Sequence, residues 1–165
     1  MASNYLRDDE RIVRFVPWSK LRRDEDDNVI GVLPQAFELR ADEDYLSATW
    51  CEYYNGTDSE QLRCAIEAIR NSDLTVGPKA RFAVGVVGEI RAIVEAPQAA
   101  KKLRIIHEPE DDNPAHAAVR HWPREDLGVL ELLASSVWST NFDAQSANNL
   151  PTSGCSVSAR GAGTA

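Results

Sequence analysis

The chain has 165 residues, of which 43% are hydrophobic and 27% are charged, so it is long enough for one buried core and too apolar to be disordered throughout. Its formal net charge of -8 argues against nucleic-acid and anionic-membrane binding. No apolar run approaches the roughly 20 residues that span a bilayer, and the polar N-terminus is unlike a signal peptide. We therefore expect a cytoplasmic protein that binds neither nucleic acid nor membrane.

The cysteines are three in number and form no C-x-x-C pair; they are Cys51, Cys64 and Cys155. An odd count without that spacing argues against a disulfide framework and against a cysteine zinc site. We expect Cys51 and Cys64 to be small, buried, apolar residues.

The first predicted elements are two strands. Apolar and charged residues alternate over 11–18, and Pro17 places this strand at a sheet edge, because proline cannot donate to a central ladder. Residues 22–28 are charged and predict a loop. A second strand follows over 29–33, and we expect the two strands to form a hairpin.

Two helices are predicted next. Thr49 and Glu52 have the spacing of a capping box, which favours a short helix over 46–55. The same spacing occurs in residues 57–60, where apolar residues then recur at helical intervals until 71–73. The second helix is the clearest element of the sequence.

Alternating apolar residues over 82–86 predict a strand, and the helical period that starts at Gly88 predicts a helix that Pro97 ends. Gly85 and Gly88 are typical of close packing between strand and helix, since two glycines three apart do not form a phosphate loop. Residues 103–107 predict a further strand.

Asparagine is a preferred N-cap and proline is preferred at the first helical position, so Asn113 and Pro114 predict a helix that runs to about Arg120. A last helix is predicted over 126–138 from its apolar stripe.

The chain is therefore expected to form a single α+β domain over residues 1–138. We expect a small, mainly antiparallel sheet of about four strands with four or five helices. Residues 139–165 are rich in Ser, Ala, Gly and Asn and are predicted to form a disordered tail, because they bury too little apolar surface to offset their ordering entropy.

Titratable groups concentrate in one segment. It holds His107, His116 and His121, with four acidic residues between the first two. We expect His107 at a strand end and His116 in the first turn of the following helix. The pattern allows an anion site at the helix N-terminus, or a divalent metal held by imidazole and by Asp111 or Asp112, or ordinary loop and capping chemistry.

Two function classes stay open. The preferred one is a non-enzymatic protein-binding or regulatory module that acts through an acidic surface with aromatic anchors. Its candidate contact residues are Trp50, Arg120, His121 and Trp122. It is preferred because no nucleophile elbow, Walker loop or dinucleotide fingerprint is present.

The alternative is a small metal- or histidine-dependent hydrolase or nuclease-like enzyme. In it His107 is the general base or a ligand, His116 binds an anion or metal, and Asp111 or Asp112 is a metal ligand. A divalent metal is the only cofactor that the residues suggest, and the sequence leaves the oligomeric state open.

The segments 19–28, 46–50 and 107–116 resemble a pattern that recurs among small uncharacterised bacterial proteins. The resemblance covers roughly residues 10–138 and excludes the tail. It implies a bacterial origin and a single domain, and it brings no activity, cofactor or site residue with it.

Overall fold

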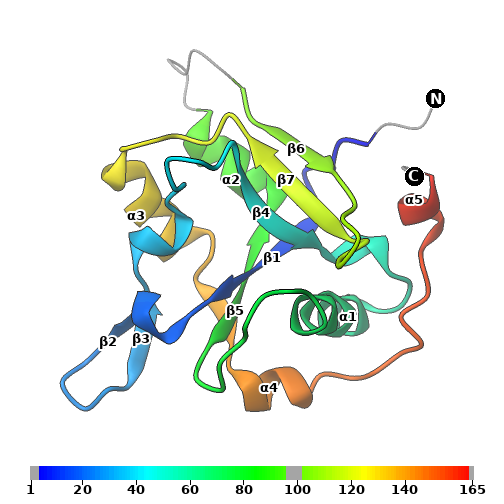
Figure 1. Cartoon of the computed structure of the whole chain (residues 1–165), viewed down its shortest axis with the longest axis horizontal. Coiled ribbons are helices and arrows are strands. Elements are labelled where there is room, and N and C mark those ends of the chain that lie inside the picture. The colour runs from blue at the N-terminus through cyan, green and yellow to red at the C-terminus, as the bar shows by residue number, and fades with distance from the viewer. Residues whose placement is uncertain (1–3, 96–101, 164–165) are drawn as a thin grey trace.

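The computed structural model describes residues 4–95 and 102–163, and within them the protein is α+β, as predicted (Figure 1). The strands are β1 (Arg11–Val16), β2 (Leu21–Arg23), β3 (Val29–Val32), β4 (Tyr45–Trp50), β5 (Arg81–Val86), β6 (Arg104–His107), β7 (His116–Arg120) and β8 (Thr140–Phe142). The α-helices are α1 (Asp58–Arg70), α2 (Val87–Val94), α3 (Leu127–Ser136), α4 (Ala144–Asn148) and α5 (Ala159–Ala162). Short 3-10 helices cover Trp18–Lys20, Pro34–Phe37 and Cys51–Tyr53.

The main sheet is antiparallel and has six strands, in the order β6-β7-β4-β1-β5-β8, rather than about four. β1 is a central strand, so its prediction as an edge strand was wrong. Pro17 lies just beyond the last residue of β1, where it removes no donor from the ladder. β3 does form a hairpin, but its partner is β2 and not β1.

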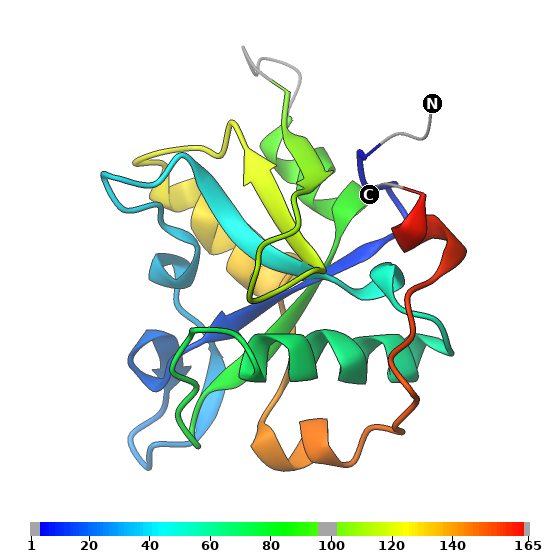
Figure 2. The same cartoon turned by 45° about the vertical axis from the view of Figure 1, so that its right-hand side comes forward.

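β1 and β4 pair over a very short distance, at Ile12 with Trp50 and at Val13 with Thr49. Beyond these pairs β1 continues along β5, whereas β4 continues along β7. The sheet therefore consists of two three-stranded halves that are joined at two residue pairs. Figures 1 and 2 show the two strands diverging from this junction.

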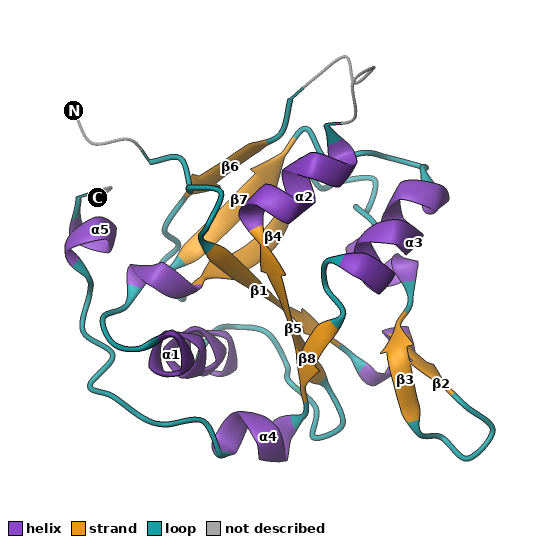
Figure 3. Cartoon of the chain, turned by 180° about the vertical axis from the view of Figure 1, so that it is seen from behind, coloured by secondary structure: helices purple, strands orange, loops and turns teal. Residues whose placement is uncertain are grey.

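Helices cover both faces of the sheet (Figure 3). α2 and α3 pack on one face, where Ile90 and Leu133 join the larger core beside Ile12 and Trp50. α1 and α4 pack on the other face in a second cluster. This second cluster is formed by Val13, Cys51, Leu62, Ala65, Ile66, Ile69, Phe82 and Ala147.

The segment 46–55 is a strand followed by a 3-10 helix, so its prediction as a helix was wrong. Leu46, Ala48 and Trp50 recur at the period of two that a strand requires, and all three lie in the larger core. The free energy gained by burying this face outweighs the weak local preference for a helix that the capping-box spacing indicates.

The helix predicted after Asn113 is also absent, because residues 116–120 form β7 between β4 and β6. Asn113 makes a turn instead. Its Oδ1 accepts a hydrogen bond from the backbone N–H of Ala115 at 3.1 Å, and its Nδ2 donates one to Thr49 Oγ1 at 2.9 Å. Two neighbouring strands supply β7 with partners that a sequence window does not reveal.

Residues 139–163, which the sequence predicts to be part of a tail, contain regular elements. They form β8, α4 and α5, and the chain from α4 to α5 runs along the outside of α1 (Figure 2). Cys155 forms a disulfide with Cys64 of α1, so the expectation of unpaired cysteines holds for Cys51 alone. Polar contacts replace the missing apolar surface: the guanidinium of Arg160 donates to the backbone oxygen of Tyr5 at 2.6 Å and to the carboxylate of Glu10 at 3.2 Å.

Other predictions are confirmed. Thr57 and Glu60 form the reciprocal capping box of α1, and the helix predicted over 126–138 is α3. Gly85 and Gly88 are close-packing positions, since added Cβ atoms would lie 2.6 Å from Trp138 Nε1 and 2.9 Å from a backbone oxygen. Pro97 lies outside the described residues. In the described ranges no helix combines the length and the apolar character needed to cross a bilayer.

Candidate functional site

His107 lies at the end of β6, as expected, but its side chain is buried and not in an open cleft. Its Nε2 lies 2.7 Å from the carbonyl oxygen of Pro114, and its ring packs against Trp50 and Tyr53 at centroid distances of 5.2 and 5.3 Å. Desolvation lowers the pKa of His107, against the opposing effect of the Pro114 hydrogen bond. This histidine is built into the core.

His116 lies in β7 and not in a helical turn. Its Nδ1 donates to the backbone oxygen of Glu108 at 2.8 Å, because a carbonyl can only accept. Its Nε2 lies 3.1 Å from Ser47 Oγ and 2.8 Å from a carboxylate oxygen of Glu110. His107 is opposite Ala117 in the strand register, so His116 projects to the other face of the sheet. The two imidazoles therefore do not form one centre.

The predicted partner-binding aromatics are core residues. Trp50 is fully buried, and Trp122 is buried with its Nε1 donating to the backbone oxygen of Phe37 at 2.7 Å. Arg120 makes a two-point ion pair with Glu108, at 2.7 Å for each bond. Neither tryptophan is available to a partner in this fold.

His121 is exposed and lies apart from the other two histidines in its contacts, with its Nδ1 2.9 Å from the carbonyl oxygen of Lys102. Asp111 is exposed, and Asp112 accepts a hydrogen bond from the backbone N–H of Asp73 at 2.9 Å. Within residues 4–95 and 102–163 no three His, Cys, Asp or Glu side chains gather as metal ligands would.

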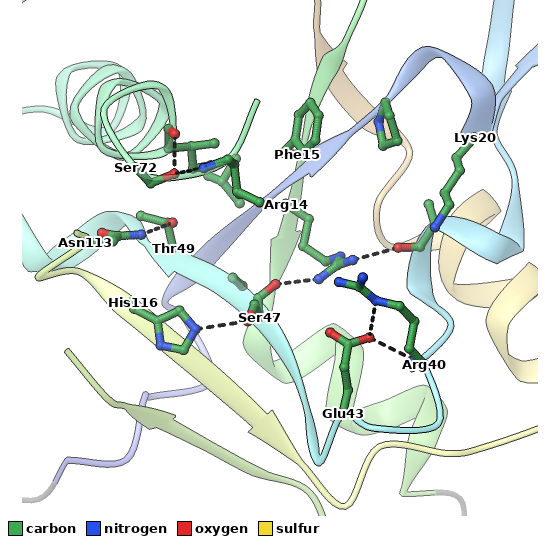
Figure 4. A pocket seen from close by; sticks show the side chains of 16 residues that line it. Arg14, Phe15, Lys20, Arg40, Glu43, Ser47, Thr49, Ser72, Asn113 and His116 are labelled. Atoms are coloured by element: carbon green, nitrogen blue, oxygen red, sulfur yellow. Dashed lines mark hydrogen bonds and ion pairs between the residues drawn. The ribbon is translucent and has the colours of Figure 1, made fainter. Parts of the chain in front are cut away.

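A pocket of about 280 Å³ opens where β1 and β4 separate (Figure 4). Its walls come from β1, β4, the end of α1, the start of β7 and the loop before β4. Polar side chains in the wall are Arg14, Lys20, Arg40, Glu43, Ser47, Thr49, Ser72, Asn113 and His116. His116 is thus the one predicted site residue that reaches this pocket.

Arg14 fills the gap that the diverging strands leave. Because β4 no longer pairs with β1 here, the backbone oxygen of Ser47 is free to accept a hydrogen bond from Nη1 of Arg14. Nη2 donates to the backbone oxygen of Ala36 at 2.8 Å. The guanidinium has five N–H groups, and its buried Nε has no hydrogen-bond partner among the described residues.

Burial makes Arg14 an unusual cation. Desolvation lowers its pKa to about 10, and the nearby carboxylate of Glu43 opposes this shift. Lys20 and Arg40 add two more cations to the wall, against one carboxylate from Glu43. Glu43 pairs with Arg40, whose Nε lies 3.3 Å from Oε1. The pocket is therefore a basic site in a protein whose net charge is -8.

Three cations of the pocket were not predicted as site residues: Arg14, Lys20 and Arg40. The available signal is an arginine between Val13 and Phe15 in an apolar strand, since a cation in a central strand is rarely buried without a role. That signal depends on β1 being central, and we had placed it at an edge.

The chain was compared with protein-family models, with curated proteins and with solved structures, and none of them matches it.

Proposed function

We propose that the protein is a non-enzymatic binding module whose ligand is a small anion held in the pocket between β1 and β4. One observation carries this proposal: the guanidinium of Arg14 lines the pocket beside Lys20 and Arg40, so that three cations face the single carboxylate of Glu43. Hydrogen bonds between a guanidinium and a carboxylate or phosphate are among the strongest in proteins.

Charge and size support an anionic ligand. A cation taken out of water is stabilised by a nearby negative charge. The carboxylate of Glu43 supplies part of that charge, and it is already paired with Arg40. The volume of about 280 Å³ matches the lower end of ligand pockets, which start at roughly 300 Å³. The pocket therefore suits a small carboxylate or phosphate rather than a macromolecule.

A protein partner, which the sequence led us to expect, stays a prediction. Because Trp50 and Trp122 are buried, such a partner would contact other residues.

Isothermal titration with propionate and with inorganic phosphate tests the anion proposal. Lys20→Gln and Arg40→Gln together remove two cations from the pocket, and we expect them to weaken binding by about tenfold or more. Lys102→Gln with Arg7→Gln is the matched control, since both side chains are exposed and outside the pocket. Equal affinities in the two double variants, or no binding to the wild type, would refute the proposal.

A hydrolase is the second candidate, because Ser47 Oγ lies 3.1 Å from His116 Nε2 in the pocket wall. That contact is the geometry of a nucleophile and its general base, with the backbone oxygen of Glu108 orienting the imidazole. Figure 4 shows Ser47 between His116 and Arg14.

Glu110 is the reason that we rank the hydrolase second. Its carboxylate lies 2.8 Å from the same Nε2, closer than Ser47 Oγ. Glu110 and Ser47 therefore compete for one ring nitrogen, and the nearer partner is the carboxylate, so Ser47 and His116 do not form an exclusive pair of nucleophile and base.

A fluorophosphonate probe followed by mass spectrometry separates the two candidates. Covalent labelling of Ser47 in the wild type, lost in His116→Gln, would establish the hydrolase and replace our proposal. The binding module predicts that Ser47 stays unlabelled.

A further inference from the structure

A second hollow of about 390 Å³ lies beside the basic pocket, and its lining is mostly apolar. The residues that line it are Phe15, Pro17, Trp18, Thr75, Gly77, Pro78, Lys79 and Ala80. We call this hollow the Trp18 groove. Among the four tryptophans, Trp50, Trp122 and Trp138 are buried, whereas Trp18 is half-buried.

The Trp18 groove and the basic pocket share walls. Phe15 and Pro17 line both hollows. The segment between α1 and β5 also contributes to both, with Ser72 and Leu74 in the basic pocket and residues 75–80 in the groove. The two hollows are thus neighbouring parts of one surface along β1.

We propose that one ligand occupies both hollows, with an anionic head in the basic pocket and an aromatic hydrocarbon body in the Trp18 groove. This inference rests on the proposed anion binding, and it names the ligand class as an aromatic carboxylate. Charge complementarity directs the head to Arg14, Lys20 and Arg40. Burial of a ring against Phe15, Pro17 and Trp18 stabilises the body.

A nucleotide also combines an anion with a flat ring, but the groove fits it poorly. The edge of a nucleobase carries donors and acceptors that need partners when buried. In the lining of the groove the polar side-chain groups are those of Thr75 and Lys79 and the indole N–H of Trp18, and the ammonium of Lys79 is already held over the ring of Trp18 at 5.1 Å. A hydrocarbon ring brings no polar group of its own that needs a partner there.

A comparison of two matched monoanions tests the inference. Titration of the wild type with 3-phenylpropionate and with propionate compares two carboxylates that differ only in the ring. We expect the phenyl compound to bind about tenfold more tightly or better, since the ring buries apolar surface. We also expect it to change the fluorescence of Trp18, and the change to be lost in Trp18→Phe.

The variant Trp18→Ala should reduce the advantage of the phenyl compound and leave the affinity for propionate unchanged. Lys20→Gln with Arg40→Gln should weaken both compounds. This pattern supports the inference, and the comparison in the wild type stands even where Trp18→Ala fails to fold.

Other outcomes are distinguishable. Equal affinities for both carboxylates, with both lost in the Lys20 and Arg40 variant, would overturn the inference and leave the anion pocket standing. If folded Trp18→Ala still binds 3-phenylpropionate more tightly than propionate, the phenyl ring binds outside the Trp18 groove, and the inference is overturned. Tighter binding of adenosine monophosphate than of 3-phenylpropionate would overturn the hydrocarbon assignment. No binding of any compound would remove the proposed function as well.

Discussion

The guanidinium of Arg14 donates a hydrogen bond to the backbone oxygen of Ser47 across the gap where β1 and β4 separate. A side chain thus occupies the place that a strand-to-strand hydrogen bond would fill in a continuous sheet. The separation both creates the pocket and places a cation in its wall.

Glu43→Gln should tighten the binding of propionate by about threefold or more, because it removes the carboxylate that competes for the cations of the pocket. The glutamine oxygen can still accept the hydrogen bond from the backbone N–H of Arg40, now 2.8 Å long, so the loop keeps its turn. Glu89→Gln, an exposed substitution on α2, is the control. Titration calorimetry measures the change, and weaker binding in Glu43→Gln would contradict the prediction.

Cys64→Ser should lower the free energy of unfolding by about 2–5 kcal/mol, since the disulfide with Cys155 closes a loop across 91 residues of sequence separation. Urea unfolding with and without reductant measures this loss. A thiol titration of the denatured, unreduced protein should find one free thiol, that of Cys51. Three free thiols would show that the bond does not form.

Acid should destabilise the protein partly through His107. Desolvation lowers its pKa in the folded state, with His116 and Arg160 acting in the same direction. The unfolded chain therefore binds more protons than the folded protein once the pH falls below about 6.5, so the stability declines from there. His107→Gln should flatten this decline in melting temperature between pH 7.5 and 5.5. The exposed His121→Gln is the control, and an equal slope in His107→Gln and wild type would show that the shift is absent.

Gly85→Ala should cost about 1–3 kcal/mol, because the new Cβ would lie 2.6 Å from Nε1 of the buried Trp138. Gly77→Ala is the matched control, since a Cβ there meets no atom within 4 Å. Urea unfolding of both variants measures the difference. A neutral Gly85→Ala would mean that Trp138 lies elsewhere.

The sequence predicted the elements whose signals are local. Helices α1, α2 and α3 were predicted because their signals lie within a few residues of each helix. For α1 the signal is the capping box of Thr57 and Glu60. For α2 and α3 it is the residues at which the helical pattern begins and ends. β4 and β7 were missed as strands because they pair with each other across a long stretch of sequence. The contacts of the C-terminal segment were missed for the same reason, since Cys155 is bonded to Cys64 and Arg160 donates to Tyr5, both far away in the sequence.

The sequence predicted few of the residues that form the candidate site. Histidines and acids attracted attention to residues 107–121, of which Asn113 and His116 line the pocket, and only His116 was predicted as a site residue. Arg14, Lys20 and Arg40 come from separate elements and share no spacing. They come together because β1 and β4 diverge, and no local pattern records that divergence.

The most direct test of anion binding is the ¹H–¹⁵N resonance of the Arg14 Nε–H group during a titration with 3-phenylpropionate and with propionate. The assignment comes from the loss of the resonance in Arg14→Lys. We expect this resonance to move progressively and to saturate with the same dissociation constant as calorimetry, because the anion binds in the pocket that the guanidinium of Arg14 lines. A resonance that stays in place while calorimetry reports binding would put the anion elsewhere and contradict the account.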